Sequence, residues 1–371
     1  MNILLVKLSS LGDVVHTLPV VQDILAAFPA AQIDWVVEKS FSPVLCGVRG
    51  LHRVIPCELR RWRKTFWTLQ TRAQWLTFKA DLQRDPYDAV IDLQGLTKSA
   101  VVARLARLSS GGQRFAMANR TEGSGYEAPT RWLADVALAM TPHVHAVARG
   151  RALAAQALGY APAAKPDFGL IFKPNQPLVE ASIACLAIEN IASEAVTVTV
   201  TVAVAVAVAD AVADADADVV PDTVALVHGT SRADKQWPLA HWVALGKRLN
   251  AAGCQVALVH GNAQEQATSQ AMAALLDDAV VWPLLPLDAV TRALARCSSV
   301  VGVDSGVSHL AVALNLPHVQ LYNIDTAWRT GPDPVNSQGR QISVFAQPAP
   351  SVAAVWRAWQ AVINTGPARQ G

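Results

Sequence analysis

The first polar turn of the chain contains a single acid, Asp13, among small residues. Its segment, Lys7-Leu8-Ser9-Ser10-Leu11-Gly12-Asp13, follows the apolar run 3–6 and precedes a segment of helical periodicity that reaches residue 27. An acid at this position can cap the helix by accepting backbone N–H groups, or it can point into a ligand-binding crevice. Pro19 leaves both interpretations open. A helix begun at Asp13 would be kinked there, whereas a helix capped by Thr17 would hold Pro19 in its first turn.

A cluster of cations follows in the segment Arg60-Arg61-Trp62-Arg63-Lys64. Guanidinium forks bind phosphate or carboxylate in a bidentate manner. The simpler interpretation is a solvated helix whose aromatic residues pack on the core, and a membrane surface is a third possible target. Residues 1–175 hold 21 Lys and Arg against 13 Asp and Glu, which predicts an anionic partner for this half of the chain. No zinc-finger, RNP-like or basic-helix pattern is present, so nucleic acid is not expected.

The sequence offers little for a metal, a disulfide frame or export. His143 and His145 are two positions apart and cannot share a helix face, so they are not interpreted as metal ligands. The five cysteines are scattered without a C-x-x-C pair and are interpreted as buried thiols of a reducing compartment. Neither a signal peptide nor an uncharged run long enough for a membrane span is evident. We therefore expect a cytoplasmic protein.

Short apolar runs alternate with glycine-containing turns and helical segments along both halves of the chain. Strands are expected at 3–6, 32–37, 53–56 and 87–93, and again at 224–228, 255–259, 280–282, 299–303 and 318–322. This pattern is typical of doubly wound α/β domains, whose ligands bind outside the carboxyl ends of the strands. We expect two such Rossmann-like domains, at 1–175 and 223–345, facing each other across a cleft. A C-terminal helix and tail are expected at 346–371, with an amphipathic helix at 356–363 that could pack back across the two domains.

Residues 176–222 differ from the rest of the chain. Valine occupies every second position from 196 to 208, and Ala-Asp repeats continue to 218. Such uniform alternation specifies the register of a strand poorly. We interpret this region as a low-complexity insertion between the domains and expect no catalytic residue in it.

Four segments of the chain together resemble one family. They are K-L-S-S-L-G-D-V-V-H-T-L-P, R-R-W-R-K, I-D-L-Q-G-L-T-K-S-A and V-D-S-G-V-S-H-L-A. In order and spacing they resemble the type I heptosyltransferases of lipopolysaccharide inner-core synthesis, in glycosyltransferase family 9. The resemblance implies a GT-B architecture with an N-terminal acceptor-binding domain and a C-terminal domain for the ADP-sugar. It also implies inverting transfer of L-glycero-D-manno-heptose from ADP-heptose to the first Kdo of Kdo2-lipid A, at the inner face of the inner membrane.

The resemblance also assigns roles to residues. Inversion needs one base on the acceptor side, and Asp13 matches it; ADP leaves without a proton, so no second carboxyl is required. Lys235 matches the cation that compensates the leaving diphosphate. No cofactor and no metal ion are then expected. The remaining donor-binding candidates are Thr230, Ser231, Glu265, Asp304, Ser305, Gly306, Val307 and His309. The acceptor-binding candidates are Ser10, Gly12, Arg60, Arg61, Arg63, Lys64, Gln94, Lys98 and Arg120.

One segment departs from the family pattern. Where the family commonly has Y-G-P-T-D-P, this chain has Tyr322-Asn323-Ile324-Asp325-Thr326-Ala327, which leaves the donor contacts of that loop open. The alternatives are a type II-like or other nucleotide-sugar transferase with a different acceptor, and a non-catalytic sugar-nucleotide or lipid A binding module. An NAD-dependent oxidoreductase shares the fold class, but no G-x-G-x-x-G follows a strand.

Overall fold

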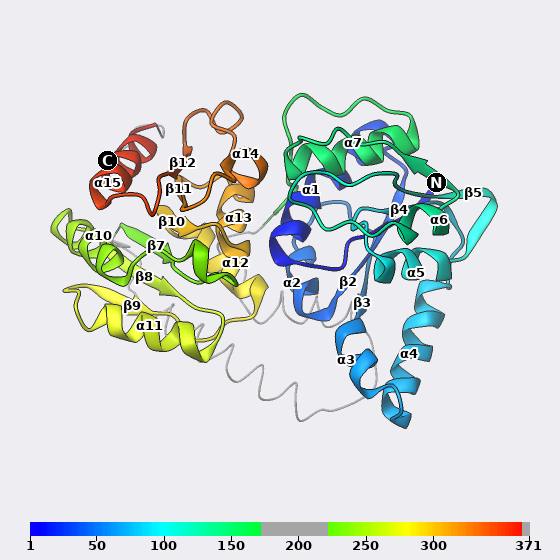
Figure 1. Ribbon diagram of the computed structural model, residues 1–371, viewed down its shortest axis with the longest axis horizontal. Coiled ribbons are helices and arrows are strands. Elements are labelled where there is room, and N and C mark those ends of the chain that lie inside the picture. The colour runs from blue at the N-terminus through cyan, green and yellow to red at the C-terminus, as the bar shows by residue number, and fades with distance from the viewer. Residues whose placement is uncertain (172–221, 366–371) are drawn as a thin grey trace. The chain divides into compact units, whose positions relative to one another are not determined.

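The computed structural model describes residues 1–171 and 222–365 and divides the chain into two compact units (Figure 1). The first unit is Met1–Ile171, and the described part of the second begins at residue 222. Each unit contains one six-stranded sheet in which all strand pairs are parallel. The predicted α/β class with two Rossmann-like domains is therefore confirmed.

The sheet of the first unit has the order β3-β2-β1-β4-β5-β6. Residues Ile3–Val6 of β1 are fully buried, because a central parallel strand is covered on both faces by helices. The strands are β1 (Asn2–Val6), β2 (Gln32–Glu38), β3 (Arg53–Cys57), β4 (Tyr87–Asp92), β5 (Leu108–Met117) and β6 (Val136–Leu138). The helices are α1 (Leu11–Ala27), the 3-10 turn η1 (Lys39–Phe41), α2 (Ser42–Leu45), α3 (Leu59–Thr65), α4 (Leu69–Leu82), α5 (Thr97–Leu105), α6 (Pro129–Leu133) and α7 (Ala146–Leu158).

The sheet of the second unit has the order β12-β11-β10-β7-β8-β9. Its strands are β7 (Thr223–Val227), β8 (Gln255–Val259), β9 (Ala279–Val281), β10 (Ser299–Val303), β11 (His318–Tyr322) and β12 (Gln341–Phe345). Its helices are η2 (Ala233–Lys235), α10 (Leu239–Ala251), α11 (Ala263–Ala273), α12 (Leu287–Ala295), α13 (Gly306–Ala313), α14 (Ala327–Thr330) and α15 (Val352–Asn364). Helix α15 packs on α10, β11 and β12 of this same unit.

Both sheets have the same connectivity when their strands are counted in chain order. In each, the first and fourth strands are neighbours, and the chain winds outward from them in opposite directions. The switch point lies between β1 and β4 in the first unit and between β7 and β10 in the second. Loops that follow these strands form the crevice in which doubly wound folds bind ligands. The fold thus selects the segments after β1, β4, β7 and β10 as candidate binding loops.

Each expected strand corresponds to an observed strand to within two residues, whereas β5, β6 and β12 have no expected counterpart. The sequence of residues 112–125 is loop-like, but 112–117 continue β5, which pairs with β4. Glycines at 111 and 112 conceal this strand from sequence patterns, because glycine weakens the strand signal. The predicted boundaries at 175 and 222 remain predictions, and the insertion at 176–222 lies outside the described residues except for its last position.

Two further expectations can be compared with the structure. Cys57, Cys254 and Cys297 are buried thiols, as expected, and Cys46 is half-buried. Cys185 lies outside the described residues. Within 1–171 and 222–365, no helix combines the length and hydrophobicity needed to cross a bilayer.

Candidate active site

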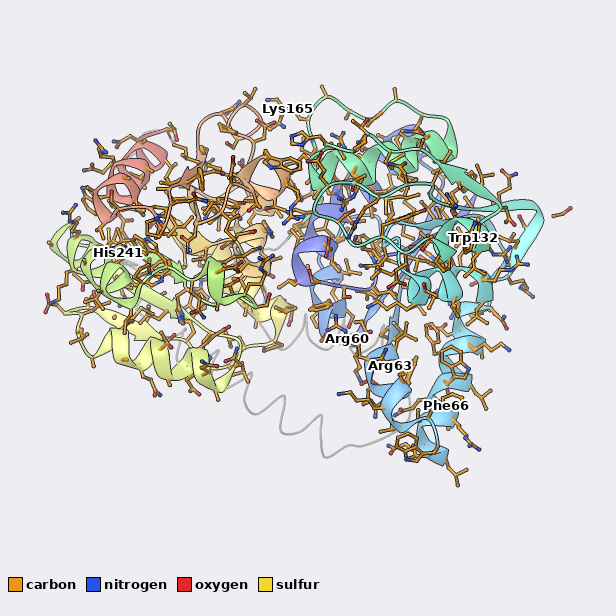
Figure 2. The ribbon with its side chains drawn as sticks, in the orientation of Figure 1. Arg60, Arg63, Phe66, Trp132, Lys165 and His241 are labelled. Carbon is orange, nitrogen blue, oxygen red and sulfur yellow. The ribbon has the colours of Figure 1, made fainter. Side chains whose placement is uncertain are left out.

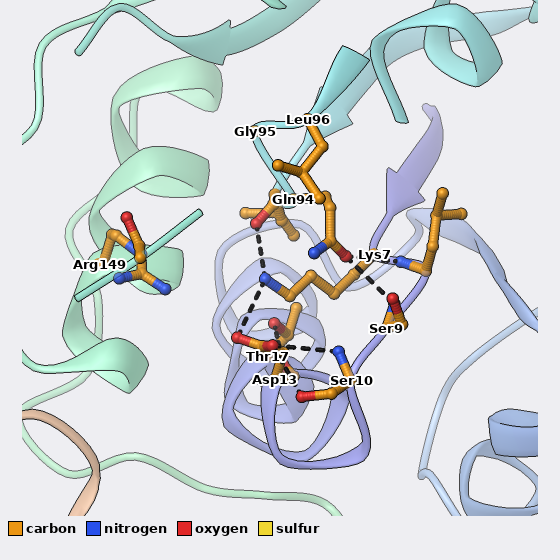
Figure 3. Close-up of polar contacts among 12 residues, drawn as sticks. Lys7, Ser9, Ser10, Asp13, Thr17, Gln94, Gly95, Leu96 and Arg149 are labelled. Atoms are coloured by element: carbon orange, nitrogen blue, oxygen red, sulfur yellow. Dashed lines mark hydrogen bonds and ion pairs between the residues drawn. The ribbon is translucent and has the colours of Figure 1, made fainter. Parts of the chain in front are cut away.

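Asp13 lies in the first turn of α1 and is tied to the residue before that helix. Its Oδ2 accepts hydrogen bonds from the Ser10 backbone N–H and the Ser10 hydroxyl, both at 3.0 Å (Figure 3). Helix α1 therefore begins at Leu11, and Pro19 lies inside it. Of the two helix starts that the sequence left open, the one capped by Thr17 is excluded, because the Thr17 hydroxyl donates to the Asp13 carbonyl at 2.8 Å within α1. The other oxygen of Asp13, Oδ1, faces Lys7, and the side chain is 37% exposed.

Lys7 is a buried cation directly after β1 whose role was not apparent from the sequence. Its Nζ donates to the Leu93 carbonyl at 3.0 Å and lies 3.6 Å from Oδ1 of Asp13. Burial lowers the pKa of Lys7, and the Asp13 charge opposes that effect only in part. Burial also acts to raise the pKa of Asp13, but the Lys7 charge and the bonds from Ser10 outweigh it and hold the pKa below its ordinary value. Asp13 is therefore a carboxylate at neutral pH.

The corner after β4 supports the same site from the neighbouring strand. The side-chain oxygen of Gln94 accepts from the backbone N–H groups of Leu8 and Ser9, each at 3.1 Å, which fixes the turn that leads to Asp13. Asp92 in turn accepts from the N–H groups of Gln94 and Gly95. Burial raises the pKa of Asp92 to about 6 although these bonds oppose the shift. The loops that follow β1 and β4 are thus joined in one hydrogen-bond network at the switch point.

Some of the predicted acceptor residues gather at this corner. The Arg60 guanidinium and the Lys98 ammonium both reach the Ser9 hydroxyl, at 3.3 Å and 3.4 Å. Arg63 and Lys98 line a cavity of about 590 Å³ between α3, α4 and α5. Arg61 instead pairs with Glu58 and Gln74. For three other candidates the structure gives the position alone: Gly12 lies within the first turn of α1, Lys64 is exposed on α3, and Arg120 is exposed after β5.

In the second unit, Asp304 is the centre of the candidate site at the end of β10. Its Oδ2 accepts from the Lys235 ammonium at 2.5 Å, and its Oδ1 lies 3.2 Å from Nε2 of His309. Burial acts to raise the pKa of Asp304, but His309 and Lys235 together hold it far below the ordinary value. The structure therefore brings three predicted donor residues together, with the carboxylate already paired to the cation.

The donor-binding candidates Ser305, Gly306 and Val307 follow the same strand. Helix α13 begins at Gly306 and Val307, and Ser305 is its N-cap residue, whose hydroxyl accepts from the Ser308 N–H at 3.5 Å. Backbone N–H groups at such a helix start favour a phosphate. The Thr230 hydroxyl, after β7, donates to the Asp304 carbonyl at 3.4 Å, and Ser231 is exposed beside it.

Glu265 lies in the first turn of α11, and its carboxylate is already engaged within the unit. Oε2 accepts from the Gly261 N–H at 2.7 Å. The carboxyl group also lies against Gly229, where an added Cβ would come within 2.6 Å of it. Gly229 therefore leaves the room that Glu265 occupies beside the β7 turn.

The loop that departs from the family pattern contributes contacts that sequence reasoning missed. Thr330, in α14, donates to Oδ1 of Asp304 at 3.4 Å. The Asn323 amide donates to the carbonyls of Asp234 and Gln236, on either side of Lys235, at 3.3 Å and 2.7 Å. The one signal in the sequence was that this loop directly follows the expected strand 318–322, so it lies at the carboxyl end of a strand. The divergent loop thus supports the Lys235–Asp304 pair in place of the family segment.

Taken unit by unit, the arrangement provides groups that suit the transfer of a group from a diphosphate. The first unit offers a carboxylate that is ionised and partly exposed, and the second offers an ammonium and a helix start suited to a diphosphate. In the part of the chain that the structure describes, no group of three or more His, Cys, Asp or Glu side chains could hold a metal ion. His143 pairs with Glu122, and His145 caps α7.

Comparison with known proteins identifies the class that this fold and site define. The family model described as glycosyltransferase family 9 (heptosyltransferase) matches residues 75–358. The chain therefore belongs to glycosyltransferase family 9, and the resemblance carried by its four segments is confirmed. Its two parallel sheets agree with the GT-B architecture of solved heptosyltransferases.

Individual relatives extend this match over nearly the whole chain. Lipopolysaccharide heptosyltransferase 1 of Pseudomonas aeruginosa is 35% identical over 338 residues, which cover 89% of this chain and 81% of the relative. The structure of Escherichia coli heptosyltransferase WaaC with ADP has a TM-score of 0.75 at 28% identity, covering 99% of this chain and 100% of the other. The same enzyme with ADP-2-deoxy-2-fluoro heptose has a TM-score of 0.70 at 29% identity and 98% coverage of both chains.

Proposed function

We propose that the protein transfers L-glycero-D-manno-heptose from ADP-heptose to the first Kdo of Kdo2-lipid A, with inversion at the anomeric carbon. Similarity to type 1 enzymes over most of the chain supports this donor and acceptor. The observation that carries the mechanism is the geometry of Asp13, a partly exposed carboxylate at the switch point between β1 and β4. Its low pKa keeps it unprotonated at the pH of the reaction.

In the proposed mechanism, Asp13 is the general base. A Kdo hydroxyl oxygen forms a bond to the anomeric carbon while the bond from that carbon to the β-phosphate oxygen breaks, and ADP leaves with the electron pair. The hydroxyl proton passes to a carboxylate oxygen of Asp13. A carboxylate is too weak a base to ionise an alcohol beforehand, so proton transfer accompanies carbon–oxygen bond formation.

The second unit supplies the donor site in this proposal. Lys235 and the N–H groups at Ser305, Gly306 and Val307 compensate the charge that develops on the diphosphate. His309 orients the phosphate or the sugar, and Asp304 and Glu265 accept hydrogen bonds from sugar hydroxyls. Thr230 and Ser231 offer hydroxyls to the same ligand. No step requires a metal ion or another cofactor.

The acceptor site in this proposal is the basic corner of the first unit. Arg60 and Lys98, which converge on Ser9, suit the Kdo carboxylates, with Ser10, Gly12 and Gln94 forming the turn beneath them. Arg61, Arg63, Lys64 and Arg120 are assigned to the lipid A phosphates. Since such an acceptor is embedded in a lipid bilayer, the protein works as a peripheral protein at the inner face of the inner membrane.

Mass measurement of the lipid product tests this function. Incubation with ADP-heptose and Kdo2-lipid A should add the mass of one heptose, and Asp13→Asn should slow turnover by about 10²- to 10⁴-fold with ADP binding unchanged. Asp333→Asn is the matched control, because Asp333 is also exposed and also accepts backbone N–H groups, yet lies outside the site. Absence of added heptose mass with the native protein rejects the proposal, as does full activity of Asp13→Asn.

A further inference from the structure

Helices α3 and α4 form a hairpin that projects from the first unit, with Phe66 at its far end (Figures 1 and 2). Large apolar side chains are exposed at this end and along the outer face of α4. Trp67 is 72% and Leu69 83% exposed, and Phe66 and Leu76 are each more than half exposed. We refer to these four residues as the apolar tip.

The apolar tip is separate from the aromatic core of the hairpin. Trp62, Trp75 and Phe78 pack together with ring centroids 5.4–5.8 Å apart, and they join α3 and α4 to each other and to the sheet. In α4 the inward positions and the outward positions Leu69 and Leu76 lie on different faces of the helix. The apolar tip is therefore not needed to form the core of the hairpin, and its side chains face outward.

The turn that carries the apolar tip is held by hydrogen bonds. The buried hydroxyl of Thr71 lies 2.9 Å from the hydroxyls of both Thr65 and Thr68. Thr68 also donates to the Thr65 carbonyl and accepts from the Thr71 N–H as the N-cap of α4. These contacts order the turn and present the aromatic rings outward at a low additional entropic cost on binding.

The charge around the apolar tip has one sign. Residues 59–80 contain six Lys and Arg and neither Asp nor Glu. Arg72 lies over the Phe66 ring, 6.0 Å from its centroid, and donates to the Phe66 carbonyl. Arg63, Lys64 and Lys79 lie on the same two helices. Aromatic and leucine side chains surrounded by cations are the combination that binds the interface of an anionic bilayer.

We propose that the apolar tip, together with Arg63, Lys64, Arg72 and Lys79, seats the protein in the headgroup region of an anionic lipid bilayer. This inference rests on the proposed function in one respect, since it assigns the membrane contact of an enzyme whose acceptor is a lipid. The cations contact lipid phosphates while Phe66, Trp67, Leu69 and Leu76 enter the boundary with the acyl chains. Of the basic corner, Arg60 lies on α3 of this same hairpin, and Lys98 lies on the neighbouring α5.

Co-sedimentation of the full chain with vesicles of phosphatidylglycerol and phosphatidylethanolamine tests the proposal. We expect the combined variant Phe66→Ser, Trp67→Ser, Leu69→Ser and Leu76→Ser to lower the partition coefficient at least tenfold, because interfacial affinity scales with the buried apolar area. Arg72→Gln and Lys79→Gln should each lower it about fivefold at low salt. Binding should be much weaker to vesicles of uncharged phosphatidylcholine alone.

Trp132→Ser is the matched control. Trp132 is 69% exposed and has Arg131 over its ring at 5.4 Å, but it lies on α6, away from the hairpin (Figure 2). Its variant should bind vesicles like the native protein. The proposal is overturned if the combined variant binds as well as the native protein, or if Trp132→Ser loses binding equally. Should the combined variant unfold, Trp67→Ser alone replaces it, since one largely exposed side chain contributes little to the core.

Activity separates this inference from the proposed function. Transfer to a water-soluble acceptor, the Kdo-bearing sugar without acyl chains, should be unchanged in Trp67→Ser, whereas transfer to acceptor embedded in vesicles should fall with the partition coefficient. Equal loss on both acceptors contradicts a membrane role for the apolar tip. If the native protein transfers heptose to neither acceptor, the proposed function fails, and the sedimentation result still decides whether the apolar tip binds membranes.

Discussion

Asp13 uses its two carboxylate oxygens differently. Oδ2 holds the Ser10 N–H and hydroxyl at the start of α1, and Oδ1 faces Lys7. The cap and base interpretations of the sequence are therefore compatible, because one oxygen orders the turn while the partly exposed carboxyl remains available to a ligand. Sequence patterns could not resolve this, since they treat capping and catalysis as alternative uses of one residue.

Lys7 is predicted to set the acid limit of activity through Asp13. In Lys7→Met the buried charge that lowers the pKa of Asp13 is lost, so that pKa rises. Because the rate falls as the base becomes protonated, the acid limb of the kcat profile should move to higher pH. A pH–rate profile measures the shift, with Lys165→Met, an exposed lysine, as control. An unchanged acid limb would show that Lys7 does not act on the base.

Asp92 should make stability depend on pH in the opposite sense from most carboxylates. Its pKa in the folded protein is about 6, above the ordinary value near 4, so its stabilising contribution is complete below about pH 4 and is lost as the pH rises through 6. Asp92→Asn imitates the neutral acid. We expect the stability of Asp92→Asn relative to the native protein to be about 1 kcal/mol more favourable at pH 7.5 than at pH 5. Denaturant unfolding at both pH values measures this difference, and no change between them contradicts the assignment.

At the scale of elements, the sequence predicted most strands because parallel strands read as continuous apolar runs. It predicted the turns after β1, β4, β7 and β10 for the same reason, since each follows such a run. It could not predict that Lys235 pairs with Asp304, because the two residues are 69 positions apart and meet only through the sheet. The contact of Thr330 with Asp304 could not be predicted either, because Thr330 follows a loop that lacks the family pattern.

Gly302 allows α13 to pack closely on β10. A Cβ at this position would lie 2.3 Å from the Ser308 hydroxyl and 2.9 Å from Cβ of Val227, with both neighbours in the interior. Gly302→Ala should therefore lower the unfolding free energy of the second unit by about 1–3 kcal/mol and weaken ADP binding through the displaced helix start. Thermal unfolding and ADP titration measure the two effects.

Gly150→Ala is the control for that substitution. Gly150 lies within α7, where an added Cβ would meet only Val20 at 3.6 Å. The exchange should stabilise the protein by up to about 1 kcal/mol because alanine is the better helix former. If Gly302→Ala proved equally stabilising, close packing of α13 on β10 would not be a constraint on this strand.

At the scale of the whole molecule, each unit has a hydrophobic core of its own. If the nucleotide binds the second unit, as proposed, ADP should raise the temperature of the unfolding transition that belongs to that unit and leave the other unchanged. The stabilisation at 100 times Kd is about 2.7 kcal/mol. Differential scanning calorimetry with and without ADP measures it. Lys235→Ala should abolish most of this shift in temperature. If ADP raised only the unfolding temperature of the first unit, the proposed binding of ADP to the second unit would be wrong.

The pairing of Lys235 with Asp304 has a consequence for how a donor would arrive and leave. In the ligand-free protein the ammonium already has a counter-ion, so an incoming diphosphate replaces one anion by another and does not meet an isolated positive charge. Such an exchange lowers the gain on binding, since the contact with Asp304 is given up. It favours departure in equal measure, because the carboxylate regains its cation once ADP is released. On the proposed assignment, the same buried acid that weakens capture of the donor also hastens the next turnover.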